Sequence, residues 1–179
     1  MKWKILSEKI IFKAKLFDVS ELQIEENGRK IIHHIARRHP TISVIPINEK
    51  SEIFLVSQYR SLLNKKTVEL IAGFIDEGED PIDAAKRELK EETGIVAKEW
   101  QKLTDIEMSA SVFRGTNHIF VAKGLTYGEP QMEPGEDISL LKFTLAQAIE
   151  KVMDGNINHS ASVIGLLLLD KKKDEFLEK

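Results

Sequence analysis

Residues 73 to 95 decide the fold of this chain, and they read G-F-I-D-E-G-E-D-P-I-D-A-A-K-R-E-L-K-E-E-T-G-I. Near its end, this stretch carries Glu88, Glu91 and Glu92. Residues at i, i+3 and i+4 share one face of an α-helix, so the three carboxylates would lie together. Their mutual repulsion calls for a nearby positive charge, and a hard divalent cation such as Mg²⁺ takes oxygen ligands of this kind.

The same stretch predicts a helix over residues 81–93. Asp80 is a favoured N-cap residue, and Pro81 suits the first helical position. Gly94 stands where a helix commonly ends in the left-handed conformation. An apolar stripe at helical spacing would be formed by Ile82, Ala85 and Leu89. A strand over residues 68–72 is expected before this helix.

A loop over residues 73–79 would join that strand to the helix. Its two glycines, Gly73 and Gly78, are expected to adopt backbone conformations that other residues disfavour. Without a side chain, Gly73 would also let a bound molecule approach the backbone closely.

The stretch resembles the Nudix box, G-x5-E-x7-R-E-U-x-E-E-x-G-U, in which U is an aliphatic residue. Its nine fixed positions are all filled, by Gly73, Glu79, Arg87, Glu88, Leu89, Glu91, Glu92, Gly94 and Ile95. An ordinary solvated helix face would explain a short acidic run, but not a match at this many positions. The resemblance implies an α/β fold, a Nudix-type α/β/α sandwich with a mixed sheet. It also implies hydrolysis of a nucleoside diphosphate linked to another group.

The resemblance further implies a metal site and its catalytic neighbours. Mg²⁺ would be the cofactor, with Mn²⁺ as the alternative. Its ligands would be the side chains of Glu88, Glu91 and Glu92 and the backbone carbonyl of Ala72. Arg87 would act with Glu91 and Glu92 in catalysis by orienting the carboxylates. Glu79 would do the same or pair with Arg87, and a purely structural ion pair between the two is the alternative.

Residues outside the box resemble the branch of the family that contains ADP-ribose pyrophosphatases and nucleoside diphosphate sugar hydrolases. The segment 58–60 matches its Q-x-R element, and the segment 69–73 matches its E-x-x-A-G lead into the box. In that branch, residues at the position of Arg37 reach across a dimer to the neighbouring active site; an ordinary surface pair of Arg37 and Arg38 is the alternative. The substrate-binding residues implied are Arg37, Gln58, Arg60, Glu69, Gly73 and Phe74.

Two further segments bear on catalysis and substrate choice. Glu136, in an acidic loop over residues 128–137, is the candidate for positioning or deprotonating the attacking water. The alternative is a solvated acid among the others in that loop. The loop after the box departs from the branch, because Ser109-Ala110-Ser111 stands where Ser-Pro-Gly is usual and Gly115 replaces a glutamate. Because that loop helps to select the substrate, the resemblance implies the reaction class and leaves the preferred nucleoside diphosphate sugar open.

Composition and charge indicate which partners and which compartment to expect. The chain has 179 residues, a formal net charge of -3 and no cysteine. No basic stripe is visible, so nucleic-acid binding is not expected. The longest apolar run, residues 163–169, is too short to cross a bilayer, so no membrane partner is expected. The absence of cysteine fits a cytoplasmic protein. The partner expected is a small nucleotide substrate.

The N-terminal residues 1–40 are expected to form strands that serve in dimerisation, and residues 41–179 the hydrolase part of one structural domain. Asn27-Gly28 is a strong hairpin signal. It would pair Ile24 with Ile31 and Leu22 with His33. Because a lone hairpin lacks a partner surface, a homodimer is expected.

Two other functions stay open beside hydrolysis of a nucleoside diphosphate sugar to a nucleoside monophosphate and a sugar phosphate. One is the hydrolysis of another nucleotide, such as a damaged nucleoside triphosphate, which would release inorganic pyrophosphate. The other is a Nudix module that binds a nucleotide sugar without cleaving it. The complete set of box carboxylates argues against the second, since a sensor has no need of them.

Overall fold

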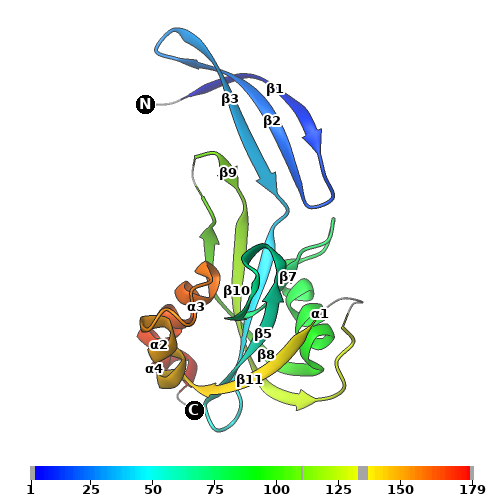
Figure 1. Cartoon of the computed structure of the whole chain (residues 1–179), viewed down its shortest axis with the longest axis vertical. Helices are drawn as coiled ribbons and strands as arrows, with labels where there is room; N and C mark the ends of the chain where they lie inside the picture. Colours follow the sequence, from blue (N-terminus) through cyan, green and yellow to red (C-terminus); the bar gives the residue numbers. More distant parts are fainter. Residues whose placement is uncertain (1–2, 110, 133–136, 178–179) are drawn as a thin grey trace. The chain divides into compact units, whose positions relative to one another are not determined.

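The computed structural model describes residues 3–109, 111–132 and 137–177, and the chain divides into two compact units. Unit 1 comprises Met1–Pro40 and Glu107–Asn117. Unit 2 comprises Thr41–Ile106 and His118–Lys179. Each unit has its own sheet structure (Figure 1).

Unit 1 is built on one sheet with the strand order β1-β2-β3-β9. Its strands are β1 (Lys4–Lys13), β2 (Phe17–Glu26), β3 (Arg29–Arg38) and the short β9 (Phe113–Arg114). The first three pair antiparallel in sequence order, and β9 runs parallel to β3. The sheet is therefore a meander whose far edge is extended by a segment from much later in the chain.

The predicted hairpin lies at the turn between β2 and β3. Asn27 and Gly28 have φ values of 52° and 76°, the left-handed conformations that this tight turn requires. Ile24 pairs with Ile31 and Leu22 pairs with His33, so the predicted register is confirmed. The turn therefore fixes which side chains of the two strands lie opposite each other.

Unit 2 contains two sheets, with the strand orders β7-β4-β10-β8 and β11-β5-β6. Its strands are β4 (Thr41–Pro46), β5 (Glu52–Arg60), β6 (Lys65–Glu69), β7 (Ile71–Phe74), β8 (Ile95–Glu107), β10 (Thr116–Tyr127) and β11 (Ile138–Thr144). A short 3₁₀ turn, η1 (Ser61–Leu63), joins β5 to β6. The long strand β8 ends in unit 1 at Glu107, and β10 begins in unit 1 at Thr116.

Four helices accompany these strands: α1 (Pro81–Thr93), α2 (Leu145–Met153), α3 (Ser160–Lys171) and α4 (Lys173–Leu177). The predicted helix over residues 81–93 is confirmed as α1, and Gly94 ends it with a φ of 72°. Thr144 begins α2 with a capping box that it shares with Gln147. Among the described residues, no helix is long and apolar enough to cross a bilayer.

Helices cover both faces of the strands in unit 2. Alternate residues of β5 belong to two separate apolar clusters, with Ile53 and Leu55 in one and Phe54 and Val56 in the other. The first cluster includes residues of α2, α3 and α4, and the second includes residues of α1. Side chains alternate between the faces of a strand, so α1 lies on one face and the other three helices on the opposite face (Figure 1). The predicted α/β/α sandwich is confirmed.

The segment before α1 differs from the prediction. The strand expected over residues 68–72 is divided between two strands, because Leu70 belongs to neither β6 nor β7. The loop expected from residue 73 starts later, since Gly73 and Phe74 still pair with β4. Backbone pairing to a central strand therefore outweighed the turn propensity of glycine.

Candidate active site

Arg87, in the middle of α1, joins three of the box glutamates. Its Nε and Nη2 atoms donate to the two carboxylate oxygens of Glu79, at 3.0 Å and 2.9 Å. Its Nη1 atom donates to Glu88 at 2.7 Å and to Glu91 at 3.2 Å. Nη2 also donates to the carbonyl of Phe74 at 2.9 Å. The guanidinium thus ties the end of β7, the following loop and the acidic face of α1 together.

The carboxyl group of Glu88 lies directly against the backbone of Gly73. A Cβ atom added to Gly73 would stand 1.9 Å from Cδ of Glu88. The φ of Gly73 is not in the left-handed region, so the expectation of an unusual backbone there is wrong. Gly78 does adopt it, with a φ of 82°. Glycine is needed at position 73 because a glutamate side chain fills the space where a side chain would stand.

The three box carboxylates on α1 differ in burial. Glu92 is only 7% exposed, whereas the side chains of Glu88 and Glu91 are 16% and 40% exposed. In the described ranges, no cluster of three or more histidine, aspartate or glutamate side chains is arranged to hold a metal ion. Arg87 donates to both Glu88 and Glu91. The donor chemistry still fits a hard divalent cation. The candidate ligands are all oxygen atoms, and the carboxylate of Glu88 lies beside the backbone of Gly73, the residue after Ala72.

Gln58 and Arg60 extend the face of β5 that carries Phe54 and Val56, the face covered by α1. Arg60 donates from Nε and Nη2 to the carboxylate of Glu69, at 3.0 Å and 2.6 Å. The pKa of Arg60 is raised, chiefly by this hydrogen bond and in smaller part by the charges of Glu69 and Glu92. Arg60 is therefore close enough to the box to interact with its buried glutamate.

Two carboxyl groups of the candidate site, Glu79 and Glu69, have pKa values below their usual range. Hydrogen bonds from Arg87 lower the pKa of Glu79. Burial acts to raise the pKa of Glu69, but hydrogen bonds from Arg60 and Thr67 and the charge of His159 outweigh it, so the net shift is downward. Both groups are thus held as carboxylates by named cationic partners.

The loop after β10 is attached to the end of α1. The N–H of Gly128 donates to the carbonyl of Gly94 at 2.9 Å, and that of Gln131 donates to the carbonyl of Glu91 at 2.8 Å. On the other side of the gap in the described chain, Asp137 pairs with Lys66 of β6 at 3.0 Å. The described ends of the predicted acidic loop are therefore held to the box helix and to the strand that carries Glu69.

Two predicted residues are not placed with the others. Glu136 lies outside the described residues, so its role stays a prediction from the resemblance. Arg37 belongs to unit 1, where it forms an ion pair with Glu8 and donates to Ser20 Oγ at 3.2 Å. Its role toward a substrate likewise stays a prediction.

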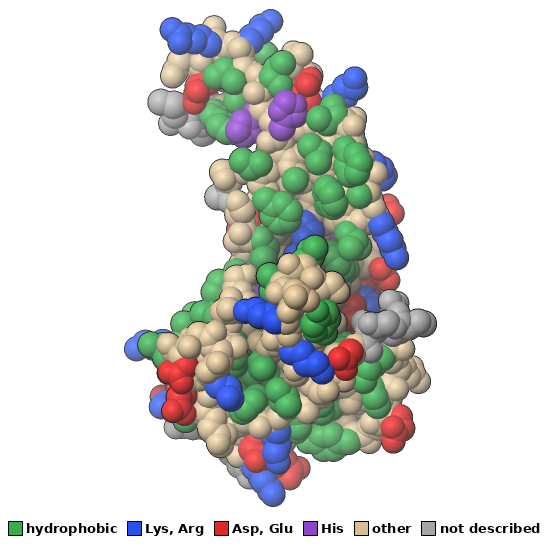
Figure 2. Space-filling model, in the orientation of Figure 1, with side chains coloured by type: hydrophobic (Ala, Val, Ile, Leu, Met, Phe, Trp, Pro, Cys, Tyr) green, Lys and Arg blue, Asp and Glu red, His purple; other side chains and the backbone are tan. Residues whose placement is uncertain are grey.

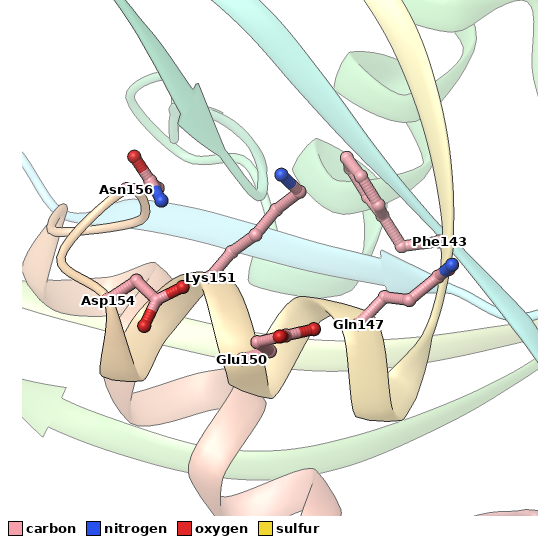
Figure 3. Close-up of a pocket in the computed structure, with 6 residues that line it drawn as sticks. All are labelled: Phe143, Gln147, Glu150, Lys151, Asp154 and Asn156. Carbon is pink, nitrogen blue, oxygen red and sulfur yellow. The ribbon is translucent and has the colours of Figure 1, made fainter.

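A separate hollow of about 360 Å³ lies on the other side of unit 2, along α2 (Figure 3). Its lining is mostly polar and consists of Phe143, Gln147, Glu150, Lys151, Asp154 and Asn156. Lys151 Nζ stands 5.3 Å from the centre of the Phe143 ring, a cation–π contact that the two sticks in Figure 3 make visible. This hollow is lined by none of the box residues.

The pairing of Glu79 with Arg87 predicts how stability depends on pH. A carboxyl whose pKa is lowered on folding adds stability above its unfolded pKa of about 4.3, and this stability is lost as pH falls through the folded value. Glu79→Gln should therefore be less stable than the wild type at pH 7, and the difference should shrink at about pH 3. Urea unfolding at both pH values measures it. An equal difference at the two pH values would contradict the assignment.

Comparison with known proteins agrees with this geometry. The NUDIX domain model matches residues 37–163, so the chain belongs to the Nudix family, and it is a Nudix hydrolase. It is 33% identical to the methanol dehydrogenase activator of Bacillus methanolicus, covering 93% of this chain and 94% of that one. It is 30% identical to the ADP-ribose pyrophosphatase of Bacillus subtilis, covering 95% and 96%. The predicted family resemblance is confirmed.

A crystal structure of an ADP compounds hydrolase has the same fold. The TM-score is 0.83, and the match covers 99% of this chain and 97% of that one at 24% sequence identity. The arrangement of strands and helices described above is therefore shared with a solved structure.

Sequence reasoning did not find two residues that contact Glu69. Thr67 Oγ1 donates to Glu69 at 2.6 Å, and His159 Nδ1 stands 3.7 Å from the same carboxylate. The spacing of Thr67 and Glu69 on one strand is a usable signal, because residues two apart share a face. His159 gives no such signal, since it lies far away in the sequence.

Proposed function

We propose that this Nudix hydrolase cleaves the pyrophosphate bond of ADP-ribose or of a related nucleoside diphosphate sugar. The products would be a nucleoside monophosphate and a sugar phosphate. The observation that carries the proposal is the similarity to the ADP-ribose pyrophosphatase of Bacillus subtilis over 95% of the chain, which extends well beyond the box. The flanking segments with Gln58, Arg60 and Glu69 fall within that match.

A divalent cation, Mg²⁺ or Mn²⁺, is part of the proposal. Glu88, Glu91 and Glu92 would hold it together with the carbonyl of Ala72. Support comes from the oxygen-only donor set and from the position of the Glu88 carboxyl against Gly73. Such an ion supplies a water of lowered pKa and neutralises charge on the phosphates. Arg87, which already holds Glu79, Glu88 and Glu91, would keep the carboxylates in place.

The remaining site residues would bind the substrate. Arg60 has five N–H donors, and Glu69 accepts from two of them. The other donors would bind a phosphate oxygen. Gln58 stands on the same face of β5. Gly73 and Phe74, at the end of β7, would line the approach to the box, and Glu69 would contribute by holding Arg60. Glu136 and Arg37 keep the roles that the resemblance implies.

The experiment that tests this function is product identification. The purified chain would be incubated with ADP-ribose and Mg²⁺, with and without EDTA, and the products separated by ion-exchange chromatography. AMP and ribose 5-phosphate, formed only with the metal, are the expected result. Inorganic pyrophosphate from a panel of nucleoside triphosphates, with ADP-ribose left intact, would identify the other hydrolase function. Binding of ADP-ribose without any product would identify a sensor.

A homodimer formed through unit 1 is a second part of the proposal. Large apolar side chains are exposed on one face of its sheet, among them Phe12 and Ile32 at 54% and 57% (Figure 2). An exposed apolar face of this kind commonly marks an interface. Sedimentation equilibrium should give twice the mass of the chain, and Ile32→Asp should shift it toward the monomer. A wild-type monomer at micromolar concentration would contradict this part.

A second candidate function is activation of a partner dehydrogenase, suggested by the 33% identity to the methanol dehydrogenase activator. Two routes to such activation are separable by one comparison. Activation that depends on hydrolysis should be lost in a variant without turnover, whereas activation by binding alone should survive in it.

A further inference from the structure

Glu69, at the end of β6, is only 2% exposed, and its carboxylate is enclosed by donors. Oε1 accepts from Arg60 Nε at 3.0 Å and from Thr67 Oγ1 at 2.6 Å, and Oε2 accepts from Arg60 Nη2 at 2.6 Å. A buried charge is tolerated only with such compensation. The orientation of the Arg60 guanidinium is therefore set by the orientation of the Glu69 carboxylate.

His159 lies near this carboxylate although it is 90 residues later in the sequence. It is the N-cap residue of α3, and its Nδ1 stands 3.7 Å from Glu69 Oε2 and 3.1 Å from Ser162 Oγ. Ser162 Oγ in turn accepts from the N–H of Leu70 at 2.9 Å. The start of α3 thus contacts both the side chain of Glu69 and the backbone N–H of Leu70, the residue between β6 and β7.

These contacts lead from the start of α3 to Arg60. His159 contacts Glu69, Glu69 holds Arg60 with two hydrogen bonds, and the charge of Arg60 interacts with that of Glu92. The carboxylate of a glutamate can rotate about its last torsion, which is broad. The imidazole beside Oε2 limits that rotation and favours the orientation in which both oxygens accept from Arg60.

We propose that His159 is a positioning residue for phosphate binding, which acts through Glu69 to hold Arg60 in its binding orientation. The proposal rests on the proposed function in one respect, that Arg60 contacts a substrate phosphate. The imidazole Nδ1 atom, 3.7 Å from Glu69 Oε2, is the group that faces the carboxylate. A residue that only begins α3 and hydrogen-bonds Ser162 would have no effect on substrate affinity.

Two substitutions of nearly the same shape separate these roles. His159→Asn and His159→Asp both give good N-cap residues, so both preserve the start of α3. Asparagine can place an N–H donor where Nδ1 stands, whereas aspartate places a second carboxylate beside Glu69. Like charges at this distance repel, so Glu69 would turn away from its present orientation.

The measurement is kcat and KM for ADP-ribose with Mg²⁺ in both variants. His159→Asp should raise KM about tenfold with little change in kcat, and His159→Asn should stay within about twofold of the wild type. In an Arg60→Ala background the difference between the two should disappear, because the effect passes through Arg60. Equal KM values for the two variants would overturn the proposal.

Two controls keep the result decisive. If His159→Asp is not recovered folded, His159→Ala takes its place and should raise KM several-fold, with an unchanged KM overturning the proposal. The same comparison is made on the Kd for ADP by calorimetry, which needs no turnover. A wild type without activity on nucleoside diphosphate sugars would refute the proposed function, whereas equal Kd values in the two variants would refute the role of His159.

Discussion

Replacing Glu92 with glutamine is expected to lower kcat by roughly a thousandfold or more, comparable with the loss of a main electrostatic contributor to catalysis. Glu92 is 7% exposed and lies in the last turn of α1. Glutamine keeps the shape and the burial but removes the negative charge that a divalent cation requires. The helix and its apolar contacts should be unaffected, so the variant should fold. Steady-state kinetics with ADP-ribose and near-ultraviolet circular dichroism measure the two quantities.

A matched control for this variant is Asp83→Asn, which removes one charge from the first turn of the same helix. Asp83 is exposed and pairs only with a neighbouring lysine among its described ion pairs, Lys86 at 2.8 Å. Its replacement should leave kcat within about twofold, since exposed pairs contribute little. Near-normal turnover in Glu92→Gln would remove Glu92 from the metal site.

Gly73→Ala is expected to lower kcat by about a hundredfold, the cost of a displacement of about 1 Å at a catalytic group. The new Cβ would meet Glu88 at 1.9 Å from Cδ and 2.0 Å from Oε1, so the carboxyl must move away. The obstructing atoms are the end of a flexible side chain rather than backbone, and the φ of Gly73 suits alanine. The variant should therefore fold while losing activity.

Gly128→Ala provides the comparison for this second variant. Its Cβ would stand 3.4 Å from the carbonyl oxygen of Gly94, an ordinary contact close to the end of the same helix. Activity should stay near the wild-type level. If Gly73→Ala kept full activity, the position of Glu88 against Gly73 would not matter for catalysis.

The parts of the fold that the sequence predicted are those set by local signals. The helix over residues 81–93 follows from its N-cap, its proline and its terminal glycine, and all of these act within a few residues. The register of the hairpin follows from Asn27 and Gly28, because the turn type fixes which residues pair. In both cases the structure has the expected bounds or pairs.

The parts that the sequence did not predict depend on contacts between distant segments. Gly73 was expected in a loop, yet it pairs with Ile42 in a sheet, and its small size is required by Glu88. Pairing with β4 is invisible to a local pattern. His159 meets Glu69 only because α3 begins beside the end of β6. A single sequence carries no signal for that meeting.

The candidate site falls between these two cases. The box predicted that Glu88, Glu91 and Glu92 share a helix face, because helical spacing alone decides it. It left open whether Glu79 pairs with Arg87, and the structure joins them by two hydrogen bonds. The choice depended on where the loop before α1 places Glu79, which spacing does not specify.

The central claim is that the box carboxylates gather divalent ions against which a diphosphate is cleaved. Crystals grown with Mn²⁺ and a nonhydrolysable ADP-ribose analogue test it most directly, since manganese is located by its anomalous scattering. The account predicts an anomalous peak within coordination distance of Glu88 and Glu92, with the diphosphate of the analogue in contact with the same ion. A bound analogue with no peak at these side chains, or a peak elsewhere on the chain, would contradict it.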